Sequence, residues 1–367
     1  MPDSTSHGPR AVFAMPVYNE EKHLRETLDS LLGQTEPDLR VVILDNCSTD
    51  ATGRIAEGYA QADRRVTYER NEAYVGVVDN YRRAFFRALS LHPSATYFAW
   101  WGGHDTADPR WLEVLAAALD SNPALVGVYP TGLSVRTNGT PTREMRTPGD
   151  TVGMHCPRDR LKVPLRGMVA QGLLRPEPVR QAGVSRRVPL PDILFLAELS
   201  ARGEILHVPE TLWARRMNPK MTKGQILRRQ RAAIFPYGTP LYARLPWLLL
   251  HGGTLFWSLA IGGSARPQVG RLEGVAVAAT YVRVHLWRRA RSVTTKKRIK
   301  ISCVYKVSRR WVRRVPPRLF SWVDKHLRRR PAKSLDRTRK RLVRRWRHVR
   351  MSIGRLLGRG VDHDPHQ

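Results

Sequence analysis

Acidic and aromatic side chains follow two short apolar segments near the start of this sequence, and their spacing is suited to a ligand site. Residues 11–17 are apolar and lead into Tyr18 and Glu20, while residues 41–44 lead into Asp45. Apolar runs that stop abruptly at polar residues are typical of buried parallel strands, because helices cover both faces of such strands. Ligands of open α/β sheets bind at the carboxyl ends of the strands. We therefore expect these side chains to contact a ligand.

Two more carboxylates stand at the boundaries of predicted elements. His104 and Asp105 follow the apolar residues 97–101, and Asp192 precedes an apolar stretch with helical spacing. Carboxylate and imidazole groups bind divalent cations, and a carboxylate can also accept a proton from a reacting hydroxyl. A structural role is the alternative for each residue, because His104 can close the strand end, Asp105 can cap a turn and Asp192 can cap its helix.

The order of these motifs resembles that of the family 2 glycosyltransferases. Two segments, Met15-Pro-Val-Tyr-Asn-Glu-Glu21 and Leu44-Asp-Asn-Cys-Ser-Thr-Asp50, are similar to the family's Pro-x-Tyr-Asn-Glu and Asp-x-x-Ser-x-Asp motifs. The resemblance extends from about residue 11 to about residue 218. It implies a nucleotide-diphospho-sugar domain of the kind called GT-A, which transfers a sugar with inversion.

The resemblance also implies which residues bind the sugar donor. They lie in the loops after the first two strands, at the start of a later helix and after a late strand: Pro16, Tyr18, Glu20, Asp45, Gly76, Asn80 and Arg216. Asp45 would contact uracil or ribose. Arg216 is indicated by its position instead, since Arg215 and Arg216 follow the strand after Asp192 and could clamp the diphosphate. Simpler roles remain open, since Glu20 and Gly76 can each start a helix and the arginine pair can be solvated.

A metal site and a general base follow from the same resemblance. Aligned on Pro109, Asp105 matches the last acid of the family's Asp-x-Asp or Asp-Asp metal motif, whereas His104 stands where another Asp is usual. We expect a divalent metal, Mn²⁺ or Mg²⁺, and His suits Mn²⁺ better. Asp192 matches the base of the family's Glu-Asp motif, with Pro191 in place of the supporting acid.

The remaining pattern predicts the elements that position these residues. Five apolar segments alternate with stretches of helical spacing, at residues 12–15, 41–44, 66–68, 97–101 and 126–129. This order predicts the α/β class, with a GT-A (Rossmann-like), mostly parallel sheet covered by helices. Residues 130–190 are rich in Pro, Gly and Arg, and we expect irregular structure there on the acceptor side. A helical, very basic C-terminal extension should follow the sheet.

Charge is distributed unevenly along the 367 residues, whose formal net charge is +32. Residues 1–240 hold 31 Lys and Arg against 26 Asp and Glu, but residues 241–367 hold 32 against 5. Such a basic segment implies a polyanionic partner. The three cysteines are far apart, which argues against a disulfide framework or a zinc site. Residues 1–10 lack the apolar core of a secretory signal, so we expect a cytoplasmic catalytic part.

The C-terminal third carries two apolar patterns. Residues 245–265 form a run of 21 residues without Asp, Glu, Lys or Arg, which could be a spanning helix, an interfacial or re-entrant hairpin, or a buried core element. Within residues 283–359, hydrophobic side chains recur at helical spacing among arginines, at Leu342, Trp346, Val349, Ile353 and Leu356. That pattern predicts an in-plane helix on the anionic inner face of the cell membrane.

These observations predict four regions and one leading function. The regions are a disordered N-terminus (1–10), a GT-A glycosyltransferase domain (11–218), an apolar helical membrane-associating region (219–290) and a basic amphipathic, partly disordered tail (291–367). The expected function is an inverting, metal-dependent glycosyltransferase that uses a nucleotide-diphospho-sugar and a glycan, lipid-linked or cell-envelope acceptor.

Two alternatives to that function remain. His104 and Pro191 depart from the family pattern, which raises the possibility of a degenerate protein that binds sugar nucleotides without turnover. The basic tail is also compatible with a nucleic-acid-binding protein, whose affinity for nucleic acid would be expected to fall steeply with salt concentration. Nucleic acid is the less favoured partner, because no known reader motif is present and the hydrophobic stripe favours lipid.

Overall fold

One α/β unit contains all the residues that can be described. The computed structural model describes residues 8–145, 149–165, 167–216, 223–262 and 269–288. These residues lie within the compact unit Met1–Arg291. Residues 1–7 of the predicted N-terminal region lie outside the described residues, and so does the basic tail, including the stripe from Leu342 to Leu356.

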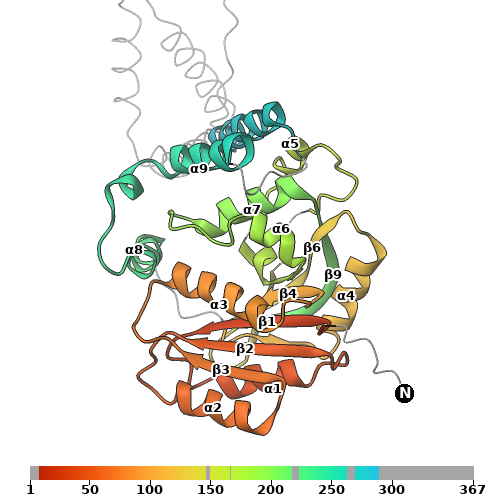
Figure 1. Ribbon diagram of the computed structural model, residues 1–367, viewed down its shortest axis with the longest axis vertical. Coiled ribbons are helices and arrows are strands. Elements are labelled where there is room, and N and C mark those ends of the chain that lie inside the picture. The colour runs from red at the N-terminus through yellow and green to blue at the C-terminus, as the bar shows by residue number, and fades with distance from the viewer. Residues whose placement is uncertain (1–7, 146–148, 166, 217–222, 263–268, 289–367) are drawn as a thin grey trace, which may run out of the picture. The chain divides into compact units, whose positions relative to one another are not determined.

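Four parallel strands form the first half of the sheet (Figure 1). Their order is β3-β2-β1-β4, with bounds β1 (Ala11–Val17), β2 (Leu39–Asp45), β3 (Val66–Arg70) and β4 (Tyr97–Trp100). In register, Val17 of β1 lies opposite Asp45 of β2, and Asp45 lies opposite Arg70 of β3. The carboxyl ends of these three strands therefore meet at one edge, as the sequence predicts.

The second half of the sheet is mixed and is dominated by two long strands. Its strands are β5 (Thr106–Ala107), β6 (Leu125–Val135), β7 (Pro141–Met145), β8 (Leu173–Leu174) and β9 (Glu204–Arg216). The short strand β8 joins β4 to β6 by antiparallel pairing, and β6 and β9 run parallel. β9 also pairs with β5, at Ala214 opposite Thr106. The last residues of β9 are thereby carried to the loop that contains His104 and Asp105.

Helices cover both faces of the sheet, which explains why β1, β2 and β4 are largely apolar. Alternate residues of β1 enter different cores: Phe13 and Met15 pack with α1 (Leu24–Leu32), α2 (Thr52–Ala62) and α4 (Trp111–Ser121), whereas Val12 and Ala14 pack with α3 (Val77–Leu91) and α7 (Pro191–Arg202). This is the covered α/β sheet that the alternating segments predict.

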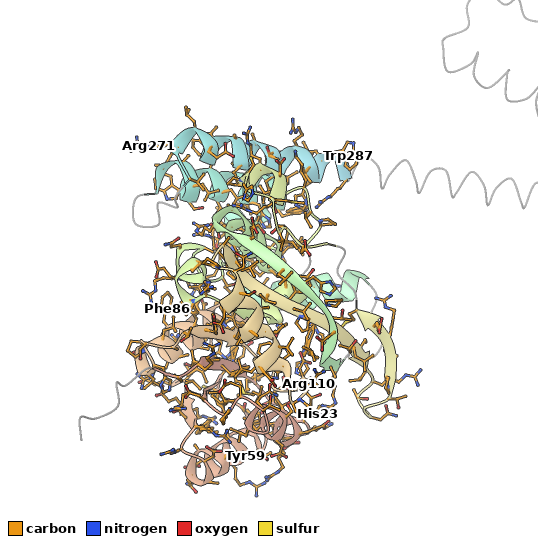
Figure 2. All side chains as sticks on the ribbon, turned by 90° about the vertical axis from the view of Figure 1, so that its right-hand side faces the viewer. His23, Tyr59, Phe86, Arg110, Arg271 and Trp287 are labelled. Atoms are coloured by element: carbon orange, nitrogen blue, oxygen red, sulfur yellow. The ribbon has the colours of Figure 1, made fainter. Side chains whose placement is uncertain are left out.

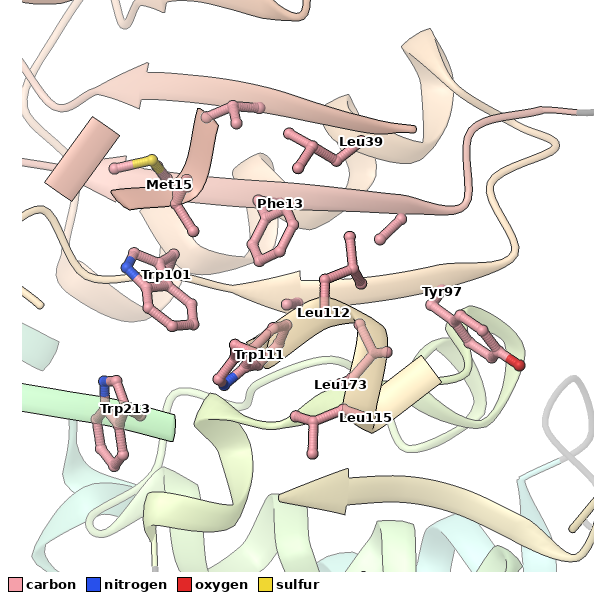
Figure 3. Packing of buried hydrophobic residues seen from close by; sticks show 14 of the residues in the cluster. Phe13, Met15, Leu39, Tyr97, Trp101, Trp111, Leu112, Leu115, Leu173 and Trp213 are labelled. Carbon is pink, nitrogen blue, oxygen red and sulfur yellow. The ribbon is translucent and has the colours of Figure 1, made fainter. Parts of the chain in front are cut away.

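Three buried aromatic rings fix the end of β4 against the start of α4. The ring of Phe13 lies 5.9 Å from that of Trp101 and 5.5 Å from that of Trp111. Trp101 and Trp111 meet edge to face at 5.1 Å (Figure 3). Because Trp101 and Trp111 flank residues 102–110, their packing holds both ends of this loop in place.

The stretch predicted to be irregular contains more regular structure than expected. β6 continues from the predicted residues 126–129 to Val135, because its outer half pairs with β9 on one side and β7 on the other. The register shifts after Pro130, where a proline cannot donate to the ladder. The described residues of this segment also form three short helices: α5 (Pro157–Arg160), η1 (Gly167–Gln171) and α6 (Pro176–Gln181).

Several helices follow the sheet and pack on α7 or on α3. They are α8 (Lys223–Ile234), η2 (Leu241–Arg244), α9 (Trp247–Phe256), the π-helical turn η3 (Trp257–Ile261) and a helix over residues 271–288. A hydrophobic cluster joins Leu194 of α7 to Leu255 of α9 and to Tyr281. In the part of the chain that is described, no helix has the length and apolar character needed to cross a membrane.

Replacement of Gly172 by alanine should destabilise the fold at the junction of β8 and β6. An added Cβ would overlap the carbonyl oxygen of Val128 and lie 2.9 Å from the Cβ of Tyr129. We expect Gly172→Ala to lower the free energy of unfolding by about 2–3 kcal/mol, as overpacking usually does. Gly58→Ala is the control, since nothing lies near its added Cβ, and it should stabilise α2 by about 0.5–1 kcal/mol. Urea denaturation of both variants decides the point, and equal stabilities would contradict it.

Candidate active site

The loops after β1 and β2 are locked together by hydrogen bonds. The backbone N–H of Asn19 donates to Ser48 Oγ (3.0 Å), and that of Thr49 donates to Asn19 Oδ1 (2.8 Å). The N–H of Glu20 donates to Thr52 Oγ1 at 2.7 Å. Asn19 adopts a left-handed conformation, with φ 55°, which asparagine tolerates better than most residues. The two strand ends thus form one rigid platform for the side chains that follow.

Asp45 lies at the floor of this platform rather than on its surface. Its carboxylate is fully buried and accepts hydrogen bonds from Ser48 N–H (2.8 Å) and Ser48 Oγ (2.5 Å) on one oxygen. The other oxygen accepts from the hydroxyl of Tyr68 (3.1 Å) and from Arg70 Nη1 (3.3 Å). The Arg70 side chain is 49% exposed. Arg70 therefore presents its cation to solvent at the edge where the sequence predicts that Asp45 meets the donor.

Two aromatic rings mark the end of β1. Tyr18 is 45% exposed, and its ring meets that of Tyr74 edge to face at 5.1 Å. The hydroxyl of Tyr237 donates to the backbone oxygen of Tyr74 at 2.5 Å, which ties this loop to the segment after α8. Pro16 is half-buried within β1. Exposed aromatic faces are suited to stacking on a nucleobase.

Gly76 and Asn80 have structural surroundings. Asn80 is buried, accepts from Asn71 Nδ2 (2.8 Å) and donates to the carbonyl of Leu44 (3.3 Å). These bonds tie α3 to the ends of β2 and β3. An added Cβ on Gly76 would lie 3.0 Å from the carbonyl oxygen of Ile234, so glycine permits the close approach of α8. Both contacts favour the helix-start alternative over direct donor contact.

His104 lies between two carboxylates. Its Nδ1 is 2.9 Å from Glu20 Oε1, and its Nε2 is 3.7 Å from Asp105 Oδ1. Burial alone would lower the pKa of His104, but the hydrogen bond and charge of Glu20, together with Asp105, raise it above the usual value. Glu20 thus orients the imidazole instead of standing free for a ribose.

Asp105 is held from three directions. Trp213 Nε1 donates to its Oδ2 (3.2 Å), and the backbone N–H of Arg216 donates to its Oδ1 (3.2 Å). Trp101 Nε1 donates to its backbone oxygen at 3.2 Å. Burial raises the pKa of Asp105 although His104 and a neighbouring arginine act in the opposite direction. The carboxylate therefore has a fixed position, and a cation beside it would offset the cost of its burial.

The side chain of Arg216 points away from the predicted diphosphate site. It is only 9% exposed, donates to the backbone oxygen of His104 (3.2 Å) and pairs with Glu26 at 2.5 Å. Its neighbour Arg215 instead lines the pocket that contains Asp192. Successive residues of a strand point to opposite faces, so only one of this pair can reach the pocket. Arg216 is thus a brace for the loop, and Arg215 is the cation available to a ligand.

A pocket of about 520 Å³ lies between the sheet, α7 and α8. Its walls combine apolar and aromatic side chains with a few polar ones, among them Tyr81, Trp100, Gln171, Asp192, Phe195, Arg215 and Gln230. Such a lining is typical of small-molecule sites.

Asp192 projects from the start of α7 into this pocket. The helix begins at Pro191, and the residue before it, Leu190, adopts a left-handed conformation with φ 56°. Asp192 is therefore a residue of the first turn rather than the helix cap. Its side chain is open to solvent, yet the pocket walls still desolvate the carboxylate and raise its pKa. Glu198 on the same helix is fully buried and is paired with Arg186 at 2.7 Å, so it is not available as a base.

His104 and Asp105 fit a divalent metal as a pair. Among the described residues, no group of three or more His, Cys, Asp or Glu is arranged to hold a metal ion. Two protein ligands are enough where substrate phosphates and water complete the shell, as they often do for Mg²⁺. Glu20 occupies His104 Nδ1 and leaves Nε2 facing Asp105, the usual arrangement behind a metal-binding histidine.

Comparison with known families finds a match for residues 12–169. These residues match the family model described as Glycosyl transferase family 2. This segment is therefore similar to glycosyl transferase family 2. The family 2 segment includes Asp45 and Asp105, whereas Asp192 and Arg215 lie beyond its end.

Individual relatives match only short parts of the chain. Glycosyltransferase GlyA of Streptococcus pneumoniae is 40% identical over 58 residues, which cover 16% of this chain and 8% of that protein. TuaG of Bacillus subtilis, a glycosyltransferase named for teichuronic acid biosynthesis, is 34% identical over 62 residues, or 17% of this chain and 25% of that protein. The crystal structure of S. aureus TarS 1-349 in complex with UDP covers 77% of this chain and 91% of its own, with 18% identity and a TM-score of 0.46.

Three residues of the candidate site are not among those that the sequence predicts. Arg70 follows the third strand, Tyr74 lies in the next loop, and the sequence indicates Arg215 only as a partner of Arg216. For Arg70 a signal was present, because it ends a strand parallel to the one that ends at Asp45. The direction of the Arg215 side chain depends on the register of β9 with β6, which the sequence alone does not define.

Replacement of Asn80 should test whether its role is structural. Asn80→Ala leaves the side chain of Asn71 and the carbonyl of Leu44 without a buried partner, so we expect a loss of about 1–3 kcal/mol in the free energy of unfolding. Asn138→Ala, in an exposed turn, is the control and should change stability by less than about 0.5 kcal/mol. Chemical denaturation measures both, and equal losses would contradict the structural role.

Proposed function

We propose that this protein is an inverting glycosyltransferase that moves a sugar from a nucleotide-diphospho-sugar to an acceptor hydroxyl. One observation carries the proposal: β9 and α7 place Arg215 and Asp192 in one pocket, and β9 also holds Asp105 beside His104. A cation, a proton acceptor and a candidate metal pair are thereby gathered at the carboxyl edge of a family 2 sheet. Inversion rests on the family resemblance.

The donor diphosphate is the group that the cations suit. Its negative charge grows as the sugar leaves, so fixed positive charge near it lowers the barrier. Arg215 lines the pocket, and its guanidinium lies 5.9 Å from the ring centre of Trp213, next to Asp105. The exposed Arg70 and the Tyr18–Tyr74 pair lie on the strand ends where the nucleoside would bind.

Asp192 is the proposed general base. Its carboxylate takes the proton of the acceptor hydroxyl as the acceptor oxygen attacks the anomeric carbon. The bond from that carbon to the phosphate oxygen breaks, and the nucleoside diphosphate leaves with the electron pair. The raised pKa of Asp192 makes the carboxylate a better proton acceptor than a solvated aspartate. Family 2 enzymes generally use a divalent metal, which His104 and Asp105 would hold and which would neutralise the leaving diphosphate.

The acceptor proposed here is a glycan or a lipid-linked or cell-envelope molecule. The likeness to TuaG supports an envelope polymer. We also propose that the enzyme works in the cytoplasm and associates peripherally with the anionic inner face of the membrane, as the basic C-terminal third suggests. A catalytically degenerate protein is the competing possibility, since His104 and Pro191 depart from the family pattern. Measured transfer would exclude it.

The general-base assignment predicts a selective loss of turnover. A donor is first identified by thermal stabilisation across a panel of nucleotide sugars with Mn²⁺. We expect Asp192→Asn to bind this donor as wild type does but to transfer sugar at least about a hundredfold more slowly, because the amide cannot take the proton. Asp159→Asn, which alters an exposed carboxylate paired with Lys162, should transfer normally. Wild-type transfer by Asp192→Asn would rule out the base.

Substitutions of Arg215 and Arg216 should have different effects, one on donor binding and the other on the stability of the loop. Arg215→Ala should weaken binding of the same donor by about tenfold or more, since it removes a charged partner of the diphosphate. Arg216→Ala should mainly lower the melting temperature, because it breaks the bonds to Glu26 and His104. Calorimetric titration and thermal unfolding of both variants measure the two effects. A pattern with the roles of Arg215 and Arg216 exchanged would refute the assignment.

A further inference from the structure

An exposed apolar face covers the outer side of the C-terminal helices. The apolar hairpin face, as we call it, consists of large hydrophobic side chains on α9, η3 and helix 271–288 that are 41–87% exposed: Leu249, Phe256, Trp257, Ile261, Leu272, Val275, Leu286 and Trp287. Figure 2 shows helix 271–288 as part of an outer layer between the labelled residues Arg271 and Trp287. Exposed apolar side chains gathered in this way mark an interaction surface.

The same helices bury their other sides, so exposure of the face does not result from loose packing. His251, Leu255 and Leu259 of α9 and η3 are buried, as are Val277 and Tyr281 of helix 271–288. His251 Nε2 lies 2.8 Å from the carbonyl oxygen of Pro189, and its Nδ1 lies 2.7 Å from the hydroxyl of Tyr281. The hairpin is thus firmly attached to the unit, while the side chains of the apolar hairpin face are exposed.

The two helices contribute to one continuous apolar groove. A cavity of about 530 Å³ lies between them and is lined almost wholly by apolar atoms, from Gly252 and Phe256 on α9 to Val275, Val282 and Leu286 on helix 271–288. Residues three, four and seven apart share one side of a helix, and Leu272, Val275, Ala279 and Leu286 follow this spacing. The two helices therefore present apolar side chains on one side, as helices that lie in the plane of a membrane surface do.

The charged residues around the apolar hairpin face indicate which kind of partner it binds. Between residues 223 and 288 the sequence has one acidic residue, Glu273, and this carboxylate is paired with Arg158 at 2.9 Å. Arg271 and Arg283 are exposed on helix 271–288, and Arg244 is exposed at the end of η2, before α9. A partner that is both apolar and anionic is required, and a bilayer with acidic head groups meets both conditions. Nucleic acid would match the charge but not the apolar side chains.

We infer that the apolar hairpin face docks into an anionic lipid bilayer, with the arginines among the head groups and Trp257 and Trp287 at the interface. Tryptophan favours this position because its ring is apolar and its N–H is polar. The inference rests on the membrane partner proposed above and names the surface that makes the contact. Since His251 holds the carbonyl three residues before Asp192, docking would bring the base loop close to a lipid-linked acceptor.

Vesicle binding of the full chain tests this surface without any sugar transfer. The probes are phosphatidylcholine vesicles with and without phosphatidylglycerol, and binding is measured by sedimentation at low and high salt. Salt screens the contribution of the basic tail but not that of buried apolar side chains. We expect wild type to prefer the anionic vesicles and to keep part of its binding at high salt. The double variant Phe256→Glu with Leu272→Glu should lose at least about tenfold in this salt-resistant binding.

Controls separate the outcomes. Phe86→Glu introduces the same charge at an exposed apolar residue of α3, which Figure 2 shows away from helix 271–288, and should bind as wild type. Both altered positions of the double variant are exposed, so circular dichroism should report an unchanged fold. Equal salt-resistant binding of wild type and the double variant would overturn the inference. Self-association of wild type without lipid, lost in the double variant, would also overturn it and assign the face to a second copy.

Discussion

The candidate site depends on one buried carboxylate, that of Asp105. Its loop leaves β4 beside the aromatic rings of Phe13, Trp101 and Trp111, but its position is completed by Trp213 and Arg216 from β9. A buried carboxylate is costly unless its hydrogen bonds and charge are satisfied. The long strand β9 must therefore be in register with β6 before Asp105, His104 and Arg215 can take their places. The side chain of Asp105 is thus positioned by a strand that lies about a hundred residues later in the sequence.

Much of the fold could be predicted from the sequence because its signals are local. Apolar runs identified β1 to β4, and their polar ends identified the edge where Asp45 and Glu20 lie. The extension of β6 to Val135 could not be read from its composition, because partner strands rather than local propensity stabilise it. The same limit applies to β8, whose two residues bridge β4 and β6 only because both are near.

The site was less predictable than the fold because side-chain direction decides function. Asp192 lines the pocket, and His104 lies beside Asp105. By contrast, Asp45 is buried under hydrogen bonds and Asn80 belongs to a buried amide network. A motif can be read from residue types and spacing, but whether a carboxylate faces a ligand or its own neighbours depends on contacts between distant elements. Ligand binding by these residues stays a prediction.

The packing of the hairpin on α7 implies that the segment needed for a stable fold is longer than the segment that matches the family. Leu194, Ala197 and Ala201 of α7 form one cluster with Leu255 and Val277 from the hairpin. A gene fusion or chimaera that joined this catalytic sheet to a foreign C-terminus just after β9 would leave that side of α7 uncovered, and the loop before Asp192 would lose His251. Chimaeras with relatives should therefore fold only when they keep the residues through 288 together with the sheet.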